Sequence, residues 1–170
     1  MTIRRLTPDD VVAYRALMLE AYERHPDAFT SSASERAALP LSWWHARLAA
    51  DDASPETVFG ALYDDRLVCT AGLAFETRTK VRHKATLFGM YVLPVARGRG
   101  FGEALVRAAL AFARSRGVRT VQLTVTEGNE AAESLYRRCG FDAFGVEPCA
   151  IAVGDAYLAK VHMWCDVAER

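Results

Sequence analysis

The sequence predicts an α/β protein with a mixed sheet, and three observations support this. Runs of apolar or alternating residues, such as 67–77 and 86–92, are typical of strands. Segments with apolar residues at helical spacing, such as 102–115, alternate with those runs and end at glycine. The 170 residues, 51% of them hydrophobic and 25% charged, suit a globular chain with one core. We therefore expect one domain over residues 1–170.

Seven strands are expected, each an apolar or alternating run bounded by polar or glycine-containing turns. They are residues 3–6, 57–63, 67–77, 86–92, 118–126, 141–147 and 157–166. The second and third form a hairpin around Asp64 and Asp65. Residues 86–92 are continuously apolar, which predicts a strand buried on both faces. The polar, irregular segment 25–40 is interpreted as a loop over a pocket.

Four helices are expected around the sheet, two after the first strand and one on each side of the fifth. The first helix begins at Pro8, and the other three cover residues 42–50, 102–115 and 129–139. Pro8 is typical of the first position of a helix, and Asp9 and Asp10 place negative charge in its first turn. Ser42 and Asn129 are typical N-cap residues. The predicted order is therefore β-α-α-β-β-β-α-β-α-β-β.

Composition and charge exclude several classes of protein. Lysine and arginine (21) balance aspartate and glutamate (21), so the chain has no basic field to hold nucleic acid. The charge-free stretch 85–96 has twelve residues, short of the roughly 20 that span a bilayer, and no signal peptide is visible. The four cysteines and four histidines lack metal-site or disulfide spacing. We expect a cytoplasmic protein without metal, nucleic acid or membrane partners.

The most informative segment is a glycine-rich turn between the fourth predicted strand and the third helix. It contains Gly98, Gly100 and Gly102. Arg97 precedes the first glycine, and Arg99 lies between the first two. Glycines let the backbone turn tightly and approach a ligand closely. Amides at a helix N-terminus form an anion site, and arginine side chains suit phosphate. The turn therefore predicts a phosphate-binding loop rather than a simple chain reversal.

Two common phosphate motifs do not fit this turn. It lacks the Gly-Lys-Ser/Thr of the Walker A loop. The dinucleotide pattern G-x-G-x-x-G fails in both registers, because Glu103 and Leu105 stand where the third glycine is required. Glu127, however, ends the next strand where a ribose-binding acid would lie. A dinucleotide-dependent oxidoreductase therefore stays an alternative.

Two blocks of sequence, in order, match one family pattern. Arg97-x-x-Gly100-x-Gly102 is similar to the R/Q-x-x-G-x-G/A pyrophosphate loop, and residues 129–141 are similar to N-x-x-A-x-x-x-Y-x-x-x-G-F. Together they resemble the GNAT superfamily of acyl-CoA-dependent N-acetyltransferases, over about residues 3–167. The resemblance implies a mostly antiparallel mixed sheet flanked by about four helices, with a splayed pair of strands that holds acyl-CoA. A non-catalytic acyl-CoA sensor on the same fold is the main alternative.

The resemblance also implies which residues bind acetyl-CoA as cosubstrate. The backbone of the fourth strand would bond the pantetheine arm through Met90, Tyr91 and Val92. The pyrophosphate would be held after Arg97 by the amides of Gly98, Arg99, Gly100, Phe101, Gly102 and Glu103. The far end of the arm would be reached by Asn129, which is equally a good N-cap.

Direct attack of an amine on the thioester is the implied chemistry. An amide near Tyr91 or Val92 would stabilise the tetrahedral oxyanion. Tyr136 would lie near the sulfur, where a tyrosine of pKa about 10 can protonate a thiolate of pKa about 8.5. The alternative for Tyr136 is a packed aromatic residue. By chain position Glu127 is the best general base and Glu76 and His83 are second choices, although a water relay would also suffice.

The resemblance implies a primary amine as acceptor, on a small molecule or a peptide, and the sequence does not choose between them. Relatives often read Tyr-x-Asp-Glu-x-x-Met in the last strand, where this chain has Ala159 and Lys160 in place of the acidic pair. If those acids bind a cationic substrate in relatives, the acceptor here differs. Family members are often homodimers, a state that this sequence neither favours nor opposes.

Overall fold

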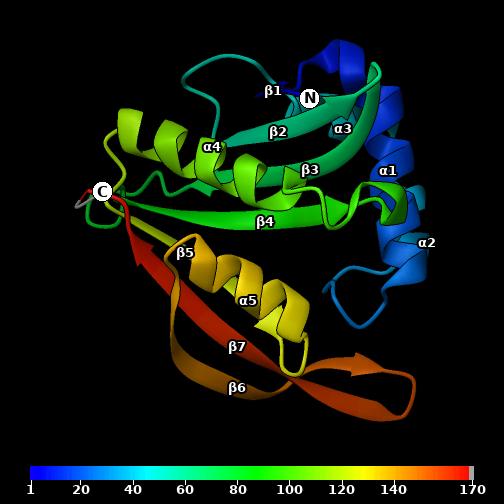
Figure 1. Ribbon diagram of the computed structural model, residues 1–170, viewed down its shortest axis with the longest axis vertical. Helices are drawn as coiled ribbons and strands as arrows, with labels where there is room; N and C mark the ends of the chain where they lie inside the picture. Colours follow the sequence, from blue (N-terminus) through cyan, green and yellow to red (C-terminus); the bar gives the residue numbers. More distant parts are fainter. Residues whose placement is uncertain (169–170) are drawn as a thin grey trace.

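A computed structural model describes residues 1–168, whose seven strands form one sheet with helices on both faces (Figure 1). The strands are β1 (Thr2–Arg5), β2 (Glu56–Tyr63), β3 (Arg66–Phe75), β4 (Lys84–Val92), β5 (Thr120–Thr126), β6 (Asp142–Val153) and β7 (Ala156–Asp166). Their order in the sheet is β1-β2-β3-β4-β5-β7-β6, and only β4 and β5 pair in parallel. The predicted mixed, mostly antiparallel sheet is confirmed.

The helices differ from the prediction in two places. They are α1 (Val11–Arg24), α2 (Ala33–Ala37), α3 (Leu41–Arg47), α4 (Phe101–Ser115) and α5 (Glu130–Arg138), with 3-10 turns at Pro8–Asp10 and Pro94–Ala96. The short α2 lies inside the predicted loop, because Ser32 and Glu35 form a capping box with bonds of 3.2 and 2.9 Å. The next helix has Pro40 rather than Ser42 at its N-cap position, where no side chain caps it, and it ends at Arg47 rather than at residue 50.

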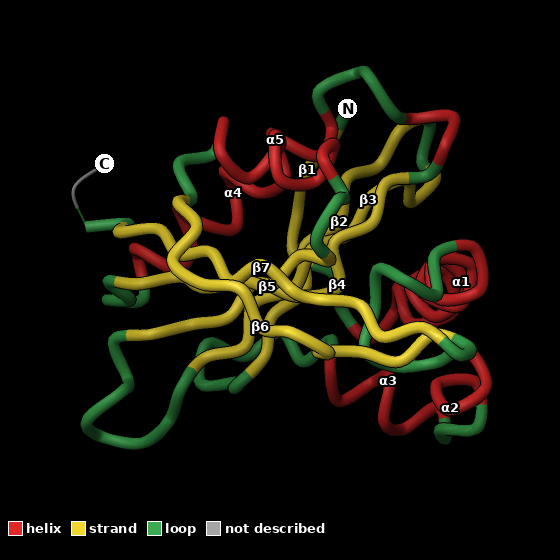
Figure 2. Tube along the Cα trace, turned by 90° about the horizontal axis from the view of Figure 1, so that it is seen from below, coloured by secondary structure: helices red, strands yellow, loops and turns green. Residues whose placement is uncertain are grey.

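The helices cover the sheet in two layers, with α4 and α5 on one side and α1, α2 and α3 on the other (Figure 2). Alternation along β2 produces this division, because neighbouring side chains of a strand point to opposite faces. Phe59 packs in the core beneath α4, whereas Val58 packs with Tyr14, Met18 and Trp44 beneath α1 and α3. Each face of the sheet therefore has its own buried core.

The one parallel pair is short, and this opens the sheet. Only Lys84–Thr86 pairs with residues 120–122, and beyond that point β4 and β5 diverge (Figure 1). The prediction that the fourth strand is buried on both faces was wrong. Leu87 is buried, but Thr86 is exposed and Met90 half-buried, and both of these residues line the opening beside β4.

A bulge bends β4 at the opening. The register with β3 shifts between Thr70, opposite Tyr91, and Gly72, opposite Phe88, so one residue of β3 faces two of β4. Gly89, at the bulge, has φ +60, a conformation that favours glycine. The bulge gives β4 a local twist away from β5.

Next to the start of α1, the Asp10 carboxylate is held by hydrogen bonds from two other residues. The Asp10 carboxylate accepts two bonds of 2.7 Å from the Arg4 guanidinium and one of 2.8 Å from the Thr7 amide. The bonds from Arg4, chiefly, hold the pKa of Asp10 below its usual value. A group whose pKa is lowered by folding stabilises the protein above its unfolded pKa, and that stability is lost as the pH falls through the folded pKa.

Asp10→Asn should therefore lower the free energy of unfolding by about 1 kcal/mol at pH 7, because the charge-assisted bonds from Arg4 are weakened. The loss should begin to shrink below a pH of about 4, where Asp10 of the unfolded chain becomes protonated, and should vanish as the pH falls through the lower pKa of Asp10 in the folded protein. Urea unfolding at pH 7 and pH 3 measures both values. An equal loss at the two pH values would contradict the assigned role of the charge.

Candidate functional site

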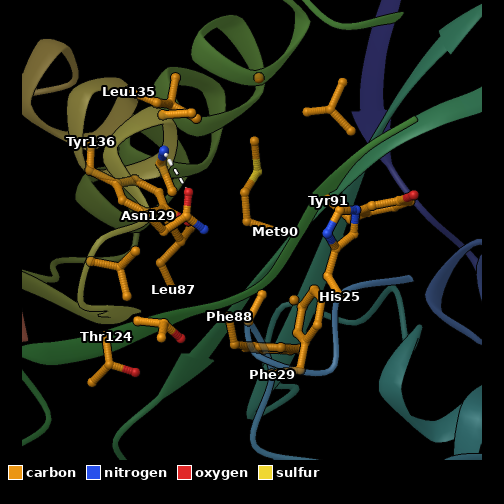
Figure 3. A pocket seen from close by; sticks show the side chains of 18 of the residues that line it. His25, Phe29, Leu87, Phe88, Met90, Tyr91, Thr124, Asn129, Leu135 and Tyr136 are labelled. Atoms are coloured by element: carbon orange, nitrogen blue, oxygen red, sulfur yellow. Dashed lines mark hydrogen bonds between the residues drawn. The ribbon is translucent and has the colours of Figure 1, made fainter. Parts of the chain in front are cut away.

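A cavity of about 840 Å³ lies where β4 and β5 separate. One wall comes from the glycine loop, α4 and α5, and the other from the end of α1, residues 28–31 and β7. In Figure 3, Asn129, Leu135 and Tyr136 lie on one side of Met90, and His25, Phe29 and Tyr91 lie on the other. The open edge of β4 runs between the two walls.

The glycine loop presents backbone donors to this cavity. Gly98 and Gly100 have φ +72 and +78, so both require the left-handed conformation that glycine adopts without strain. Gly100 is the N-cap of α4 and no side chain caps the helix. The first amide to bond back to it is that of Ala104, at 3.0 Å from the Gly100 oxygen. The amides before Ala104 are therefore positioned to bind an anion at the helix N-terminus.

The two arginines of the loop point in different directions. Arg97 donates to the Val92 carbonyl at 3.1 Å and lies 3.1 Å from His25 Nε2, so it joins the loop to the tip of β4 and the end of α1. The Arg99 guanidinium lies 5.4 Å from the centre of the Tyr63 ring, and Arg99 is not among the residues that line the cavity. Its expected contact with the cosubstrate stays a prediction.

The remaining residues of the loop fix its position. Phe101 is buried in the core below α4. The Glu103 carboxylate accepts from Arg107 at 2.9 Å and from Arg138 of α5 at 3.1 Å, and these bonds lower the pKa of Glu103. These bonds thus join the two helices that frame the cavity at its mouth. A Cβ at Gly102 would lie only 3.0 Å from the Met90 methyl group, so a larger residue there would have to displace the Met90 side chain.

The tip of β4 turns one amide toward the opening. Leu93 donates to Val68 of β3 at 2.9 Å. Because successive amides of a strand alternate in direction, the Val92 amide faces the open edge and that of Tyr91 faces β3. The Tyr91 hydroxyl donates to the Glu20 carboxylate at 3.3 Å. The pKa of Tyr91 is raised, chiefly by burial and to a smaller extent by the negative charge of Glu20.

Asn129 and Tyr136 lie together on the α5 wall (Figure 3). Asn129 Oδ1 accepts from the Ala132 amide at 3.2 Å, so the residue is the N-cap of α5. Its amide group still lines the cavity, which is compatible with both predicted roles. Tyr136 is 7% exposed, packs edge-on against Phe141 at 5.8 Å, and has its pKa raised by burial and by the nearby thiols of Cys139 and Cys69.

The predicted general bases lie apart from this group. Glu127 follows β5, is exposed, and is not among the residues that line the cavity, while its amide donates to Ala159 at 2.9 Å. Glu76 and His83 adjoin the start of β4, at the opposite end of that strand from the glycine loop. The role of Glu127 stays a prediction.

Sequence reasoning missed most of the second wall. Its lining includes His25, Phe29, Arg36, Arg47 and Lys160. For His25, Phe29 and Arg36, the sequence indicated only that residues 25–40 form a loop over a pocket. Lys160 stood out as a departure from the family pattern, and Arg47 had no signal, because only the tertiary fold brings α3 to the cavity.

Two other kinds of feature are absent from residues 1–168. No group of three or more histidine, cysteine, aspartate or glutamate side chains there could hold a metal ion. No helix of this part of the chain is both long and apolar enough to cross a membrane.

Comparison with known proteins assigns the family. The sequence profile of the acetyltransferase (GNAT) family matches residues 15–141, so the chain belongs to the GNAT acetyltransferase family. The dinucleotide-dependent oxidoreductase has no support from this assignment. The predicted family and fold class are confirmed.

Curated relatives are similar over part of their length. The chain is 28% identical over 148 residues to the mycothiol acetyltransferase of Renibacterium salmoninarum, covering 83% of this chain and 40% of that protein. It is 38% identical over 77 residues to the streptothricin acetyltransferase of Streptomyces lavendulae, covering 45% of this chain and 41% of that protein. The chain thus spans less than half the length of either relative.

Solved structures share the whole fold. A GNAT-family acetyltransferase of Streptococcus pneumoniae superposes with a TM-score of 0.85, at 22% identity over 96% of each chain. The yncA protein of Salmonella typhimurium, solved with acetyl-CoA, has a TM-score of 0.81 at 20% identity, covering 98% of this chain and 94% of that one. At these identities the likeness shows the fold alone.

The glycine loop can be tested with a matched pair of variants. Gly100 and Gly117, at opposite ends of α4, have φ +78 and +77, and a Cβ at either would meet no atom within 4 Å. Gly100→Val and Gly117→Val should therefore cost similar stability through backbone strain. Only Gly100 lines the cavity, so only Gly100→Val should weaken acetyl-CoA binding, and Gly102→Val should do the same.

Isothermal titration with acetyl-CoA and thermal melts of all three variants measure the two effects. We expect at least a tenfold loss of affinity for the two loop variants and none for Gly117→Val. Unchanged affinity in both loop variants would mean that the glycines serve the chain turn only.

Proposed function

We propose that the protein is an acetyl-CoA-dependent N-acetyltransferase that transfers the acetyl group to a primary amine. The observation that carries this proposal is one cavity in which the N-terminus of α4, the unpaired edge of β4 and the buried Tyr136 meet. The family assignment and the acetyltransferase names of the relatives support the same activity.

The cosubstrate would lie along the opening between β4 and β5. Its pyrophosphate would accept from the amides of the glycine loop, which include Gly98 and Gly102. The pantetheine arm would then take the place of the missing neighbour strand along Met90 and Val92, because an unpaired strand edge offers donors and acceptors at regular spacing. This order brings the thioester toward Tyr136.

The reaction needs no covalent enzyme intermediate. The amine nitrogen attacks the thioester carbonyl carbon, and the Val92 amide stabilises the oxyanion that develops. The C–S bond then breaks and the electron pair leaves on sulfur. Tyr136 donates its proton to that thiolate, the amine proton passes to a base, and solvent returns a proton to Tyr136. The products are an N-acetylated amine and free CoA.

The surroundings of Tyr136 suit a proton donor. Burial raises the pKa of Tyr136, so the hydroxyl is protonated at every pH near neutrality. The raised pKa also makes Tyr136 a weaker acid, so proton transfer would depend on a hydrogen bond to the sulfur that strengthens as negative charge develops there. Glu127, acting through water, is the proposed base.

The proposed acceptor is a small-molecule amine. Two relatives are named for small molecules, mycothiol and streptothricin. The second wall of the cavity, between α1, α3 and β7, is the place for this acceptor, because the first wall is occupied by the proposed cosubstrate.

Binding of acetyl-CoA should stabilise the folded protein. At a concentration one hundred times the Kd, linkage predicts a gain of about 2.7 kcal/mol and a clear rise in Tm. NAD at the same concentration should cause none. Differential scanning fluorimetry compares the two ligands, and a shift with NAD alone would exclude the proposed cosubstrate.

Tyr136→Phe separates an enzyme from a binding protein. The variant keeps the ring that packs on Phe141 and removes only the proton donor. The kcat should fall about 10²- to 10⁴-fold, while the Kd for acetyl-CoA should change little. The loss should shrink with a thioester whose thiol is more acidic, since that leaving group needs less help.

CoA release in steady state and acetyl-CoA titration measure the two constants. Tyr157→Phe removes the same atom from an exposed ring of β7 and should leave both constants unchanged. A Tyr136→Phe protein with native stability and near-native kcat would leave Tyr136 as a packing residue.

A further inference from the structure

The second wall of the cavity carries more positive charge than its own carboxylates balance. We define the acceptor wall as Tyr22, Phe29, Arg36, Arg47, Glu56, Phe88 and Lys160, all of which line the cavity. Three of these side chains are cations and one is a carboxylate, an excess of two positive charges. Aromatic rings lie between the charges.

Of the three cations of the acceptor wall, Arg47 is paired with a carboxylate of the same wall. Its Nε donates to the Glu56 carboxylate at 3.0 Å, and its side chain is only 12% exposed. Its guanidinium carbon lies 4.5 Å from the centre of the Trp43 ring and 4.6 Å from that of Phe88. Arg47 and Glu56 therefore form a neutral, fixed part of the wall.

Arg36 has no such partner within residues 1–168. Its guanidinium lies 4.6 Å from Trp43 and 5.9 Å from Tyr22, measured to the ring centres. Its Nε is buried and has no hydrogen-bond acceptor there. The neighbouring Glu35 is used by the capping box at Ser32. A buried, unpaired guanidinium N–H is costly unless a ligand supplies the acceptor.

Lys160 is the second cation of the wall without an ion-pair partner among residues 1–168. It lies on β7 opposite Thr126, is 5% exposed, and donates to the Ala28 carbonyl at 3.4 Å. Its cross-strand neighbour Glu147 is instead 2.8 Å from His162. Burial lowers the pKa of Lys160, and the more distant carboxylates of Glu147 and Asp27 offset this only in part. An anion bound beside Lys160 would therefore stabilise its charged form.

The two cations without an ion-pair partner lie near the same aromatic pair. Phe29 follows Ala28, to which Lys160 donates, and the Phe29 ring packs edge-on against Tyr22 at 5.1 Å. Arg36 lies over the other member of that pair. A ligand that covers Tyr22 and Phe29 therefore approaches both charges, and a purely cationic amine would be repelled by them.

We propose that the acceptor is an amine that also carries a carboxylate or a similar oxyanion, held by Arg36 and Lys160. This inference rests on the proposed acetyltransferase activity and adds the substrate class to it. The guanidinium of Arg36 offers the planar donors that match a carboxylate, and Lys160 adds a second charge. The apolar part of the molecule packs on Phe29 and Phe88, which leaves its amine to face the thioester.

The test compares amines with and without the anionic group, each at an equal concentration of its neutral amine form. Phenylalanine, phenylalaninamide and 2-phenylethylamine form one series, with the same three forms of leucine and methionine, and 4-aminobutyrate against butylamine. Rates of CoA release with acetyl-CoA give kcat/KM for each. We expect the carboxylate form to exceed its uncharged partners about tenfold or more. Uncharged forms that react equally well or better would overturn the inference and leave the acetyltransferase activity standing.

A binding measurement decides the case in which no probe is acetylated. The CoA-loaded protein is titrated with N-acetylphenylalanine and with its uncharged amide. Tighter binding of the anion supports the inference, and equal binding overturns it. If acetyl-CoA itself does not bind, the proposed function fails, and the inference fails with it.

Substitutions of Arg36 and Lys160 test whether these residues cause the preference for the carboxylate form. Arg36→Gln, and separately Lys160→Met, which keeps the aliphatic stem, should raise KM for the carboxylate form about tenfold. KM for the amide and kcat should stay within about twofold. Arg114→Gln, on an exposed position of α4, is the matched control and should change neither. If both wall variants retain the native preference for the anion, the assigned residues are wrong.

Discussion

The early end of the pairing between β4 and β5 is the constraint on which the rest of this structure depends. Three residue pairs hold the two strands together, and the bulge at Gly89 then turns β4 away. An unpaired strand edge inside a protein leaves backbone donors and acceptors to be satisfied. The cavity, the direction of the Val92 amide and the proposed path of pantetheine all follow from this local loss of pairing.

The two walls beside that opening have different chemistry. The first is backbone: a helix N-terminus whose cap is a glycine, with Glu103 bridging α4 and α5 through Arg107 and Arg138. Backbone N–H groups at a helix N-terminus can bind phosphate whichever side chains the loop carries. The second is made of aromatic and charged side chains, and it is there that a substrate can be selected.

Burial favours the uncharged form of ionisable groups on both walls of the cavity. It raises the pKa of Tyr136, which keeps the hydroxyl neutral, and it lowers the pKa of Lys160. The Nε–H of Arg36 is buried without an acceptor among the described residues, and a guanidinium stays charged in a protein. In the proposed reaction, an anionic group on the acceptor would therefore stabilise the charged form of Lys160 and supply the acceptor that Arg36 lacks.

The sequence by itself determined the strand order along the chain, the glycine loop, the N-cap at Asn129 and the family, because each rests on local spacing and backbone preference. It did not reveal that the apolar fourth strand has an open edge, since burial depends on which strand lies beside it. Only the tertiary structure brought Arg47 of α3 and Lys160 of β7 to one wall and left Glu127 outside the lining. Those positions depend on contacts between elements far apart in the chain, and no local pattern records such contacts.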